Sequence, residues 1–267
     1  MASDNSANAI ASGKVETSAD RKYPAWVRHD LERDYYDKEW GIPITHETGM
    51  LERVCLEGFQ AGLSWYTVLV KRPVFREVFA DFVPEKLAAF TDDDVERLLH
   101  DKRIIRNNLK IRATISNARL TLNLRERAAA GDESLAGFHL PNGLWVEPGL
   151  PAFIWSFLPE STITPKTLEE VPTQNDVSAA MSKAFKKLGG KFLGPTSCYA
   201  LMCAIGMVDA HLVDSHRRGS SGLFTPEGEL PLGDASATQI SYIEAAKWVC
   251  QNMGIDEADF YEAMVSF

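Results

Sequence analysis

A glutamate interrupts the apolar stretch around residue 55, and two glycines follow it closely. Glu57 comes directly after Val54-Cys55-Leu56 and shortly before Gly58 and Gly62. A carboxylate in such a run must be paired, exposed or functional, because burying an unpaired charge is costly. Glu57 is therefore the first candidate for a residue that carries out chemistry.

Aromatic side chains are concentrated on both sides of this glutamate in the sequence. The candidates are Trp26, Tyr35, Trp40 and Trp65. Aromatic residues usually fill protein cores, and that alternative applies to each tryptophan taken alone. Together with a carboxylate, they supply what a pocket for an extruded nucleic-acid base requires: walls for stacking and a polar group that reads the base edge. The set predicts a base-binding pocket at Glu57.

A glycine-rich turn separates two predicted helices further along the chain. Residues 187–196 are typical of a helix-hairpin-helix, since two glycines end one helix and Pro195 begins the next. Gly194 would let the backbone approach DNA, and free N–H groups at the next helix start, around Thr196, would hold a phosphate oxygen. Lys191 would add charge. An ordinary helix corner is the alternative, whereas an ATP-binding loop is rejected because proline replaces its lysine.

The net charge of −9 argues against an extended basic surface for nucleic acid. A DNA site must therefore be a local patch, and two stretches offer one. They are Lys102, Arg103, Arg106, Lys110 and Arg112, and Lys183, Lys186, Lys187 and Lys191. Each stretch taken alone is typical of a solvated helix face.

Helical periodicity dominates the sequence, whereas strand alternation is scarce. Helical signals cover residues 51–59, 92–99, 104–127, 176–188, 195–205, 242–253 and 256–265. Residues 219–237 are rich in Gly, Ser and Pro and indicate a loop. Without an internal repeat or a clean linker, the pattern predicts an all-α fold of one or two tightly joined helical lobes.

The N-terminal residues, the lack of long apolar stretches and the cysteines indicate where in the cell the protein works. Residues 1–20 lack apolar periodicity and are predicted to be a disordered tail. Neither a secretory signal nor a membrane span is recognisable, so we expect a soluble, cytoplasmic protein. The four cysteines form no C-x-x-C pair, which favours reduced thiols in the core over a disulfide framework.

Four segments, in the same order, closely resemble the type I 3-methyladenine DNA glycosylase family of the helix-hairpin-helix superfamily. They are residues 35–43, 55–65, 102–119 and 191–211. The run Leu-Glu-Gly-x-Gln-Ala-Gly-Leu-Ser-Trp within the second is highly specific. The resemblance defines an expected glycosylase domain at 21–216, followed by a C-terminal helical extension, 217–267, packed on that domain.

The resemblance implies a monofunctional enzyme of base excision repair that acts without a cofactor, as a monomer, on double-stranded DNA. It would flip out 3-methyladenine and hydrolyse the N-glycosidic bond. The resemblance also assigns site residues: Glu57 at the base edge, Trp65 stacking on the base, Tyr35, Trp26 and Trp40 shaping the pocket, Gly62 and Leu63 near the vacated gap, and the hairpin at Gly194 on the backbone.

The sequence departs from this family at its zinc site. Typical members hold zinc with two Cys and two His, and the matching positions here are Pro24, Tyr36, His211 and Ser215. One imidazole cannot form a tetrahedral zinc site, so we predict no bound metal.

Two other functions fit parts of this pattern. One is a DNA-binding protein that keeps the fold without catalysis, although the intact Glu57, Tyr35 and Trp65 argue against it. The other is an enzyme for a different alkylated purine, since Phe59 and the region of Glu32 differ from the family pattern. Identifying the bases released from methylated DNA separates these alternatives.

Overall fold

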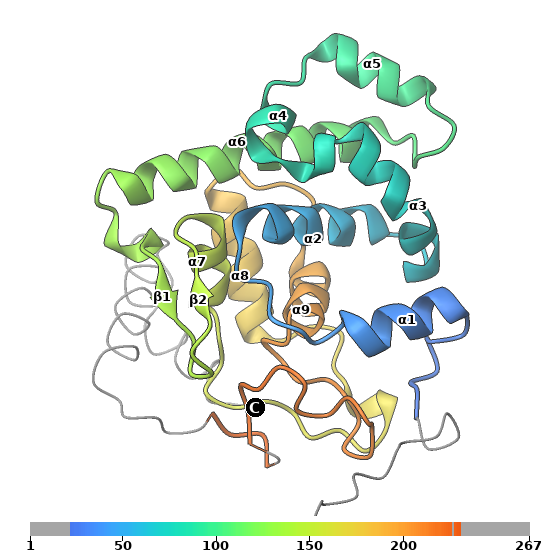
Figure 1. Cartoon of the computed structure of the whole chain (residues 1–267), viewed down its shortest axis with the longest axis vertical. Coiled ribbons are helices and arrows are strands. Elements are labelled where there is room, and N and C mark those ends of the chain that lie inside the picture. Colours follow the sequence, from blue (N-terminus) through green and yellow to red (C-terminus); the bar gives the residue numbers. More distant parts are fainter. Residues whose placement is uncertain (1–21, 226, 231–267) are drawn as a thin grey trace, which may run out of the picture.

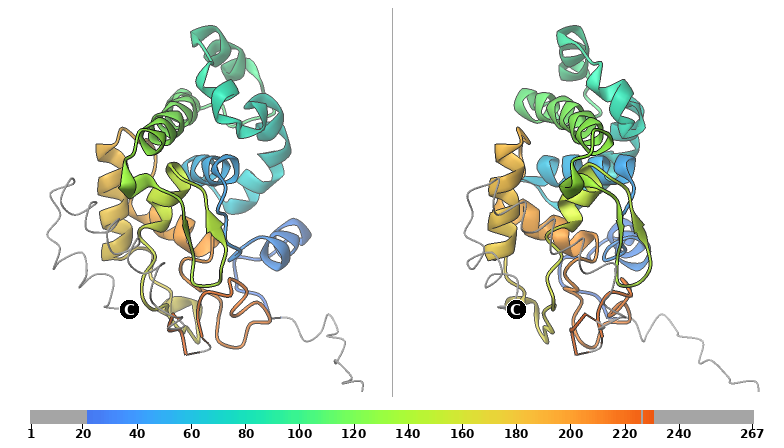
Figure 2. Two further views of the ribbon diagram at one scale, coloured as in Figure 1. Left: turned by 60° about the vertical axis from the view of Figure 1, so that its left-hand side comes forward. Right: turned by 90° about the vertical axis from the view of Figure 1, so that its left-hand side faces the viewer.

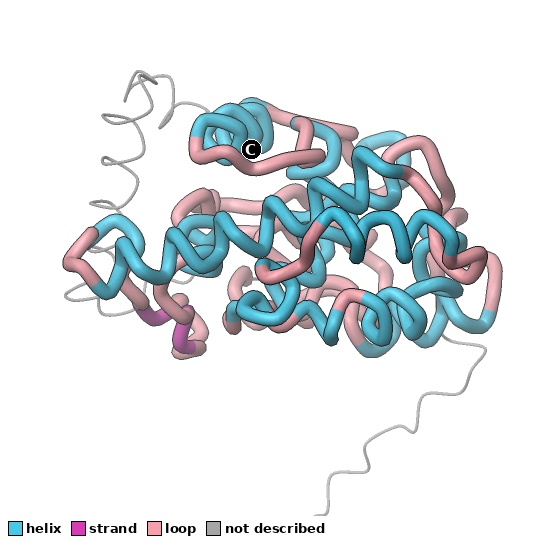
Figure 3. Tube along the Cα trace, turned by 90° about the horizontal axis from the view of Figure 1, so that it is seen from above, coloured by secondary structure: helices cyan, strands magenta, loops and turns pink. Residues whose placement is uncertain are grey.

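The computed structural model describes residues 22–225 and 227–230, and helices dominate this part of the chain (Figures 1 and 3). Its α-helices are α1 (Asp30–Lys38), α2 (Glu47–Gln60), α3 (Trp65–Val78), α4 (Pro84–Ala88), α5 (Asp92–His100), α6 (Asn108–Ala129), α7 (Leu150–Trp155), α8 (Asp176–Lys187) and α9 (Pro195–Ala204). Short 3-10 turns are η2 (Ala80–Phe82), η3 (Glu133–Leu135) and η4 (Leu168–Glu170). The prediction of an all-α fold is confirmed.

Helix α2 forms the centre of the core. Figure 1 shows it crossing the middle of the molecule, with α6 above it and α9 below. Met50, Leu51, Leu56 and Phe59 are fully buried around it. Neighbours cover most of its circumference, so the charged residues Glu47, Arg53 and Glu57 of α2 are buried along with its apolar ones. This position also takes Glu57 out of contact with bulk water.

Helices α4 and α5 pack on α6 at the end of the molecule opposite to residues 206–225 (Figure 2). Thr91 and Asp94 form a reciprocal capping box at the start of α5, which covers the helix predicted over 92–99. Stacked and tilted phenylalanines join α2 to α3 and η2; they are Phe59, Phe75, Phe79 and Phe82.

Two local expectations need correction. The helix expected from residue 104 begins at Asn108, because the Asn107 side chain accepts a hydrogen bond from the Lys110 N–H and caps α6 there. A small antiparallel hairpin, β1 (Phe138–His139) with β2 (Trp145–Val146), was not predicted. Its turn contains Asn142-Gly143, a pair that is common in β-hairpin turns. The two strands have only two residues each, too few to show the alternating pattern by which a strand is predicted.

The turn between α8 and α9 is anchored to two other helices. Asn117 of α6 makes two hydrogen bonds with the Lys191 backbone, one to its N–H at 2.9 Å and one to its carbonyl at 3.1 Å. A Cβ atom added at Gly58 of α2 would lie 3.3 Å from both the Cβ and the carbonyl oxygen of Phe192. Glycine at position 58 thus permits close contact between α2 and this turn.

Several expectations lie outside the described residues: the tail at 1–20, both helices beyond residue 241, and Cys250. The described start of the extension packs inward through Leu223 and Phe224. Cys55, Cys198 and Cys203 are buried free thiols, as predicted. Within the described chain, no helix has the length and apolarity that crossing a bilayer requires.

Candidate active site

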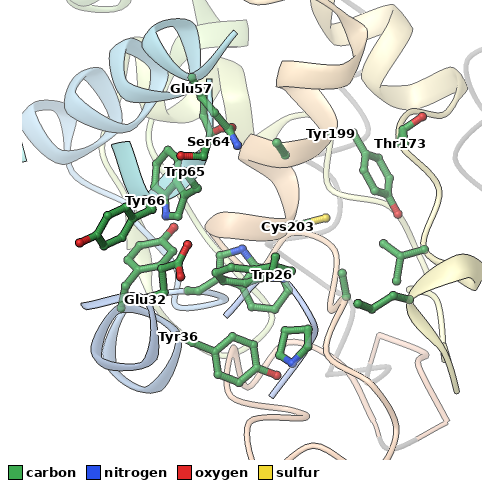
Figure 4. Close-up of a pocket in the computed structure, with 18 of the residues that line it drawn as sticks. Trp26, Glu32, Tyr36, Glu57, Ser64, Trp65, Tyr66, Thr173, Tyr199 and Cys203 are labelled. Atoms are coloured by element: carbon green, nitrogen blue, oxygen red, sulfur yellow. The ribbon is translucent and has the colours of Figure 1, made fainter. Parts of the chain in front are cut away.

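A pocket of about 720 Å³ opens between α1, the end of α2, the start of α3, α9 and residues 168–173 (Figure 4). Its walls include the five residues expected there: Glu57, Tyr35, Trp26, Trp40 and Trp65. Figure 4 shows Glu57, Ser64 and Trp65 at one end and Tyr199 and Thr173 at the other. The fold thus brings together aromatic and acidic side chains that are up to 39 residues apart in the sequence, from Trp26 to Trp65.

Glu57 is the buried acid of this pocket, with an exposed fraction of only 3%. Burial raises the pKa of its carboxyl to about 7, although the nearby Arg53 guanidinium acts in the opposite direction. Among the described residues, neither Oε2 of Glu57 nor Nε1 of Trp65 has a hydrogen-bond partner. Buried polar atoms are rarely left unpaired, so an acceptor and a donor are available here for a ligand.

The raised pKa of Glu57 makes stability depend on pH with a definite sign. Between about pH 4.5 and 7 the folded protein retains a proton that the unfolded chain releases, so rising pH lowers the free energy of unfolding. Glu57→Gln removes this effect. From pH 5 to pH 8 we expect the variant to gain about 2 to 3 kcal/mol relative to wild type. Urea unfolding of both proteins at each pH measures the difference, and parallel pH profiles would contradict the burial of this carboxyl.

Arg53 holds the aromatic wall next to Glu57. Its Nη1 donates to the Tyr35 hydroxyl at 2.6 Å, and its guanidinium carbon lies 5.1 Å from the Tyr35 ring centroid and 5.7 Å from that of Trp65. The two rings are 5.3 Å apart. Arg53 was not among the predicted site residues, yet it stands four positions before Glu57, which places both on one face of α2.

The other wall is a stack of aromatic rings from the N-terminal segment. Tyr36 and Trp40 stack at 5.4 Å between ring centroids, and Trp26 meets Trp40 edge to face at 5.6 Å. Rings that pack on one another lose little freedom when a flat ligand arrives, because they are already ordered.

The turn after α2 contains Gly62 and places Leu63 in the lining of the pocket. Gly62 has φ of +80°, a conformation that favours glycine, and Leu63 is 41% exposed and lines the pocket. The Lys110 ammonium donates to the carbonyls of Phe59 and Ala61, at 2.8 and 2.6 Å. This lysine supplies hydrogen bonds to carbonyl groups at the end of α2 that have no partner within the helix, and it fixes the turn that carries Leu63.

The predicted phosphate contacts lie on the helix hairpin, which is α8, α9 and the turn between them. Thr196, in the first turn of α9, also lines the pocket. Gly194 precedes α9, and a Cβ added there would meet no atom of the described residues within 4 Å, so its backbone is open on this side. The four lysines of the second basic stretch are exposed. In the first stretch, Lys102 and Arg106 are exposed, whereas Arg103 pairs with Asp101 and Arg112 pairs with Asp92. The hairpin thus presents four exposed lysines beside the open backbone at Gly194.

The family model described as methyladenine glycosylase matches residues 26–142 and 146–218. The chain belongs to this family. DNA-3-methyladenine glycosylase 1 of Escherichia coli is 45% identical over 192 residues, which cover 70% of this chain and 92% of that protein. The resemblance to the type I 3-methyladenine DNA glycosylase family is thereby confirmed.

Solved structures of the same enzyme type match over most of their length. A crystal structure of 3-methyladenine DNA glycosylase I has a TM-score of 0.65 and 38% identity, covering 74% of this chain and 100% of the other. The Staphylococcus aureus enzyme, studied for its recognition of 3-methyladenine, has a TM-score of 0.62 and 28% identity, covering 72% and 93%.

The four positions at which the sequence resemblance predicts zinc ligands hold a different set of contacts. Tyr36 and Ser215 share a 2.7 Å hydrogen bond between their hydroxyls, and Nδ1 of His211 lies 2.7 Å from Oδ1 of Asp209. Pro24 offers no ligand. No group of three His, Cys, Asp or Glu side chains suited to a metal occurs in the described ranges. These residues do not fit tetrahedral zinc.

We expect a chelator such as EDTA to leave both the melting temperature and base release of this protein unchanged. Direct contacts, such as the Tyr36–Ser215 hydrogen bond and the Lys22–Asp214 ion pair, join the two ends of the glycosylase region here. Metal analysis of the purified protein, combined with thermal melts, provides the test. About one zinc per chain, with unfolding on chelation, would show that the ligand positions have been assigned wrongly.

Proposed function

We propose that this chain removes 3-methyladenine from double-stranded DNA by flipping the base into the pocket and hydrolysing its N-glycosidic bond. The observation that carries the proposal is the buried carboxylate of Glu57, with an unpartnered oxygen, beside the unpartnered indole nitrogen of Trp65. The relatives described above are named for this activity or for recognition of this base.

The chemistry requires little acid catalysis. Methylation at N3 gives the base a positive charge, so the bond between N9 and C1′ can break with its electron pair passing to the base, which leaves neutral. Water then adds to C1′ and releases a proton to solvent. Glu57 favours the cationic lesion over neutral adenine, and the aromatic walls orient the base. Asp209, a buried acid shortly after α9, takes no part in this chemistry. Its carboxylate bonds to His211 and accepts a hydrogen bond from the Gly219 N–H.

The direct test is to incubate the protein with methylated double-stranded DNA and to identify the released bases. Release of 3-methyladenine alone supports the proposal. Release of other alkylated bases would indicate a broader substrate range, whereas binding without release would indicate a DNA-binding protein that lacks activity.

DNA would approach the face formed by the hairpin and the turn after α2. Backbone N–H groups at Gly194 and Thr196 would hold a phosphate, Lys191 would add charge, and Leu63 would enter the gap left by the flipped nucleotide. Since one chain contributes the pocket and all of these contacts, we propose that it acts as a monomer.

We expect the protein to leave an intact abasic site without cutting the strand. A lyase needs an amine that forms a Schiff base with the sugar, and no lysine is among the described residues that line the pocket. Lys110, whose ammonium lies at the end of α2, bonds to two backbone carbonyls. Borohydride treatment during turnover should therefore trap no covalent complex, and a trapped complex would contradict the assignment.

A further inference from the structure

A second carboxylate faces the pocket from a different helix. Glu32 lies in the first turn of α1, is 5% exposed and lines the pocket. Figure 4 shows it on the same side of the pocket as Trp65 and Tyr66. The His29 ring stacks on the Tyr66 ring, with centroids 3.9 Å apart, which closes this edge of the pocket.

One oxygen of Glu32 is fully engaged and the other is not. Oε2 accepts hydrogen bonds from the backbone N–H groups of Arg28 at 2.9 Å and His29 at 3.0 Å, and lies 2.8 Å from Nδ1 of His29. Within residues 22–225 and 227–230, Oε1 has no hydrogen-bond partner among the protein groups. The protein thus fixes the carboxylate through Oε2 and leaves Oε1 for a ligand.

The two acids of the pocket differ in charge near neutral pH. Burial acts to raise the pKa of Glu32, but the hydrogen bonds from Arg28 and His29 outweigh it and leave that pKa below its ordinary value. Burial raises the pKa of Glu57 to about 7. At pH 7, therefore, Glu32 is ionised in essentially every molecule and Glu57 in only part of the population.

We propose that Glu32 is a second substrate-contacting carboxylate, which gives the pocket its preference for positively charged purines. This inference rests on the proposed function, since it concerns the base that enters the same pocket. Opposite charges at hydrogen-bond distance inside a pocket attract more strongly than in water, so a fixed anion here discriminates between cationic and neutral bases.

The structural alternative is that Glu32 serves only to cap α1. It forms a capping box with His29, and glutamine can fill the same role in such a box. Glu32→Gln therefore removes the charge and keeps the cap. Asp30→Asn is the matched control, because Asp30 lies in the same first turn, is exposed and does not line the pocket.

The experiment measures binding of two free bases by the fluorescence of the pocket tryptophans. The probes are 3,9-dimethyladeninium, which has a fixed positive charge, and neutral 9-methyladenine. Titrations at pH 8 keep Glu57 ionised as well. For Glu32→Gln we expect the affinity for the cation to fall about tenfold or more, with unchanged affinity for the neutral base. Asp30→Asn should match wild type, and Glu57→Gln should retain part of the preference.

Two results would overturn the proposal independently. One is an unchanged preference for the cation in Glu32→Gln, whether or not the melting temperature falls. The other, which does not depend on how Glu32→Gln folds, is complete loss of the preference in Glu57→Gln. Failure of the proposed function is a separate outcome: wild type would then release no 3-methyladenine from DNA, whatever the two free bases show.

Discussion

Glu57→Gln should lower the release of 3-methyladenine from methylated DNA on the order of 100-fold. The substitution keeps the shape of the side chain and removes the negative charge beside the base. Single-turnover release with enzyme in excess measures the effect on the chemical step. Because Glu57 is buried in the pocket and is not one of the proposed phosphate contacts, affinity for undamaged DNA should stay the same.

Glu96→Gln provides the control for this experiment. Glu96 is exposed on α5, at the far end of the molecule from the pocket, and its substitution makes the same change in net charge. Its release rate should equal that of wild type. If Glu57→Gln also releases base at the wild-type rate, Glu57 has a structural role only.

Gly194→Val should reduce affinity for DNA of any sequence by roughly tenfold to 100-fold. Its φ of −77° suits any residue, and a Cβ there meets no protein atom within 4 Å, so the fold accommodates the side chain. The added atoms would instead separate the hairpin backbone from the phosphate. Fluorescence anisotropy with two unrelated duplexes, alongside a thermal melt, measures both properties.

Gly194→Ala gives a graded comparison, because its smaller side chain should cause a smaller loss of affinity. Base release from saturating DNA should be close to wild type in both variants, since the pocket is intact. Equal affinities for wild type and Gly194→Val would rule out the hairpin as the phosphate contact.

Sequence features that act locally were enough to predict much of the fold. The start of α5 depends on Thr91 and its acidic first turn, and the start of α9 on Pro195, so each could be recognised from neighbouring residues. Helix α6 begins later than expected because the periodicity of its apolar residues does not register the Asn107 cap. Periodicity shows which residues face the core, but it defines helix ends poorly.

Part of the candidate site could likewise be predicted from local features of the sequence. Glu57 and the tryptophans are chemically unusual for their positions, so they were recognisable without a structure. The wall at residues 168–173 was not, because it reaches the pocket only through the packing of segments distant in sequence. Glu32 was noted only as part of a region that differs from the family pattern, although it stands three positions before Tyr35 on α1. A charged residue in the first turn of a helix is also common on protein surfaces, which conceals a role such as that of Glu32.

The anchoring of the hairpin determines which molecule must deform when the protein meets DNA. Asn117 fastens the turn to α6, Gly58 brings it against α2, and Lys110 braces the neighbouring turn of Leu63. The proposed phosphate contact and the exposed tip at Leu63 are thus held by the same set of helices, which fixes their spacing. On the proposed function, the duplex would bend to fit that spacing, so the stiffness of the base steps around a lesion would contribute to the binding energy.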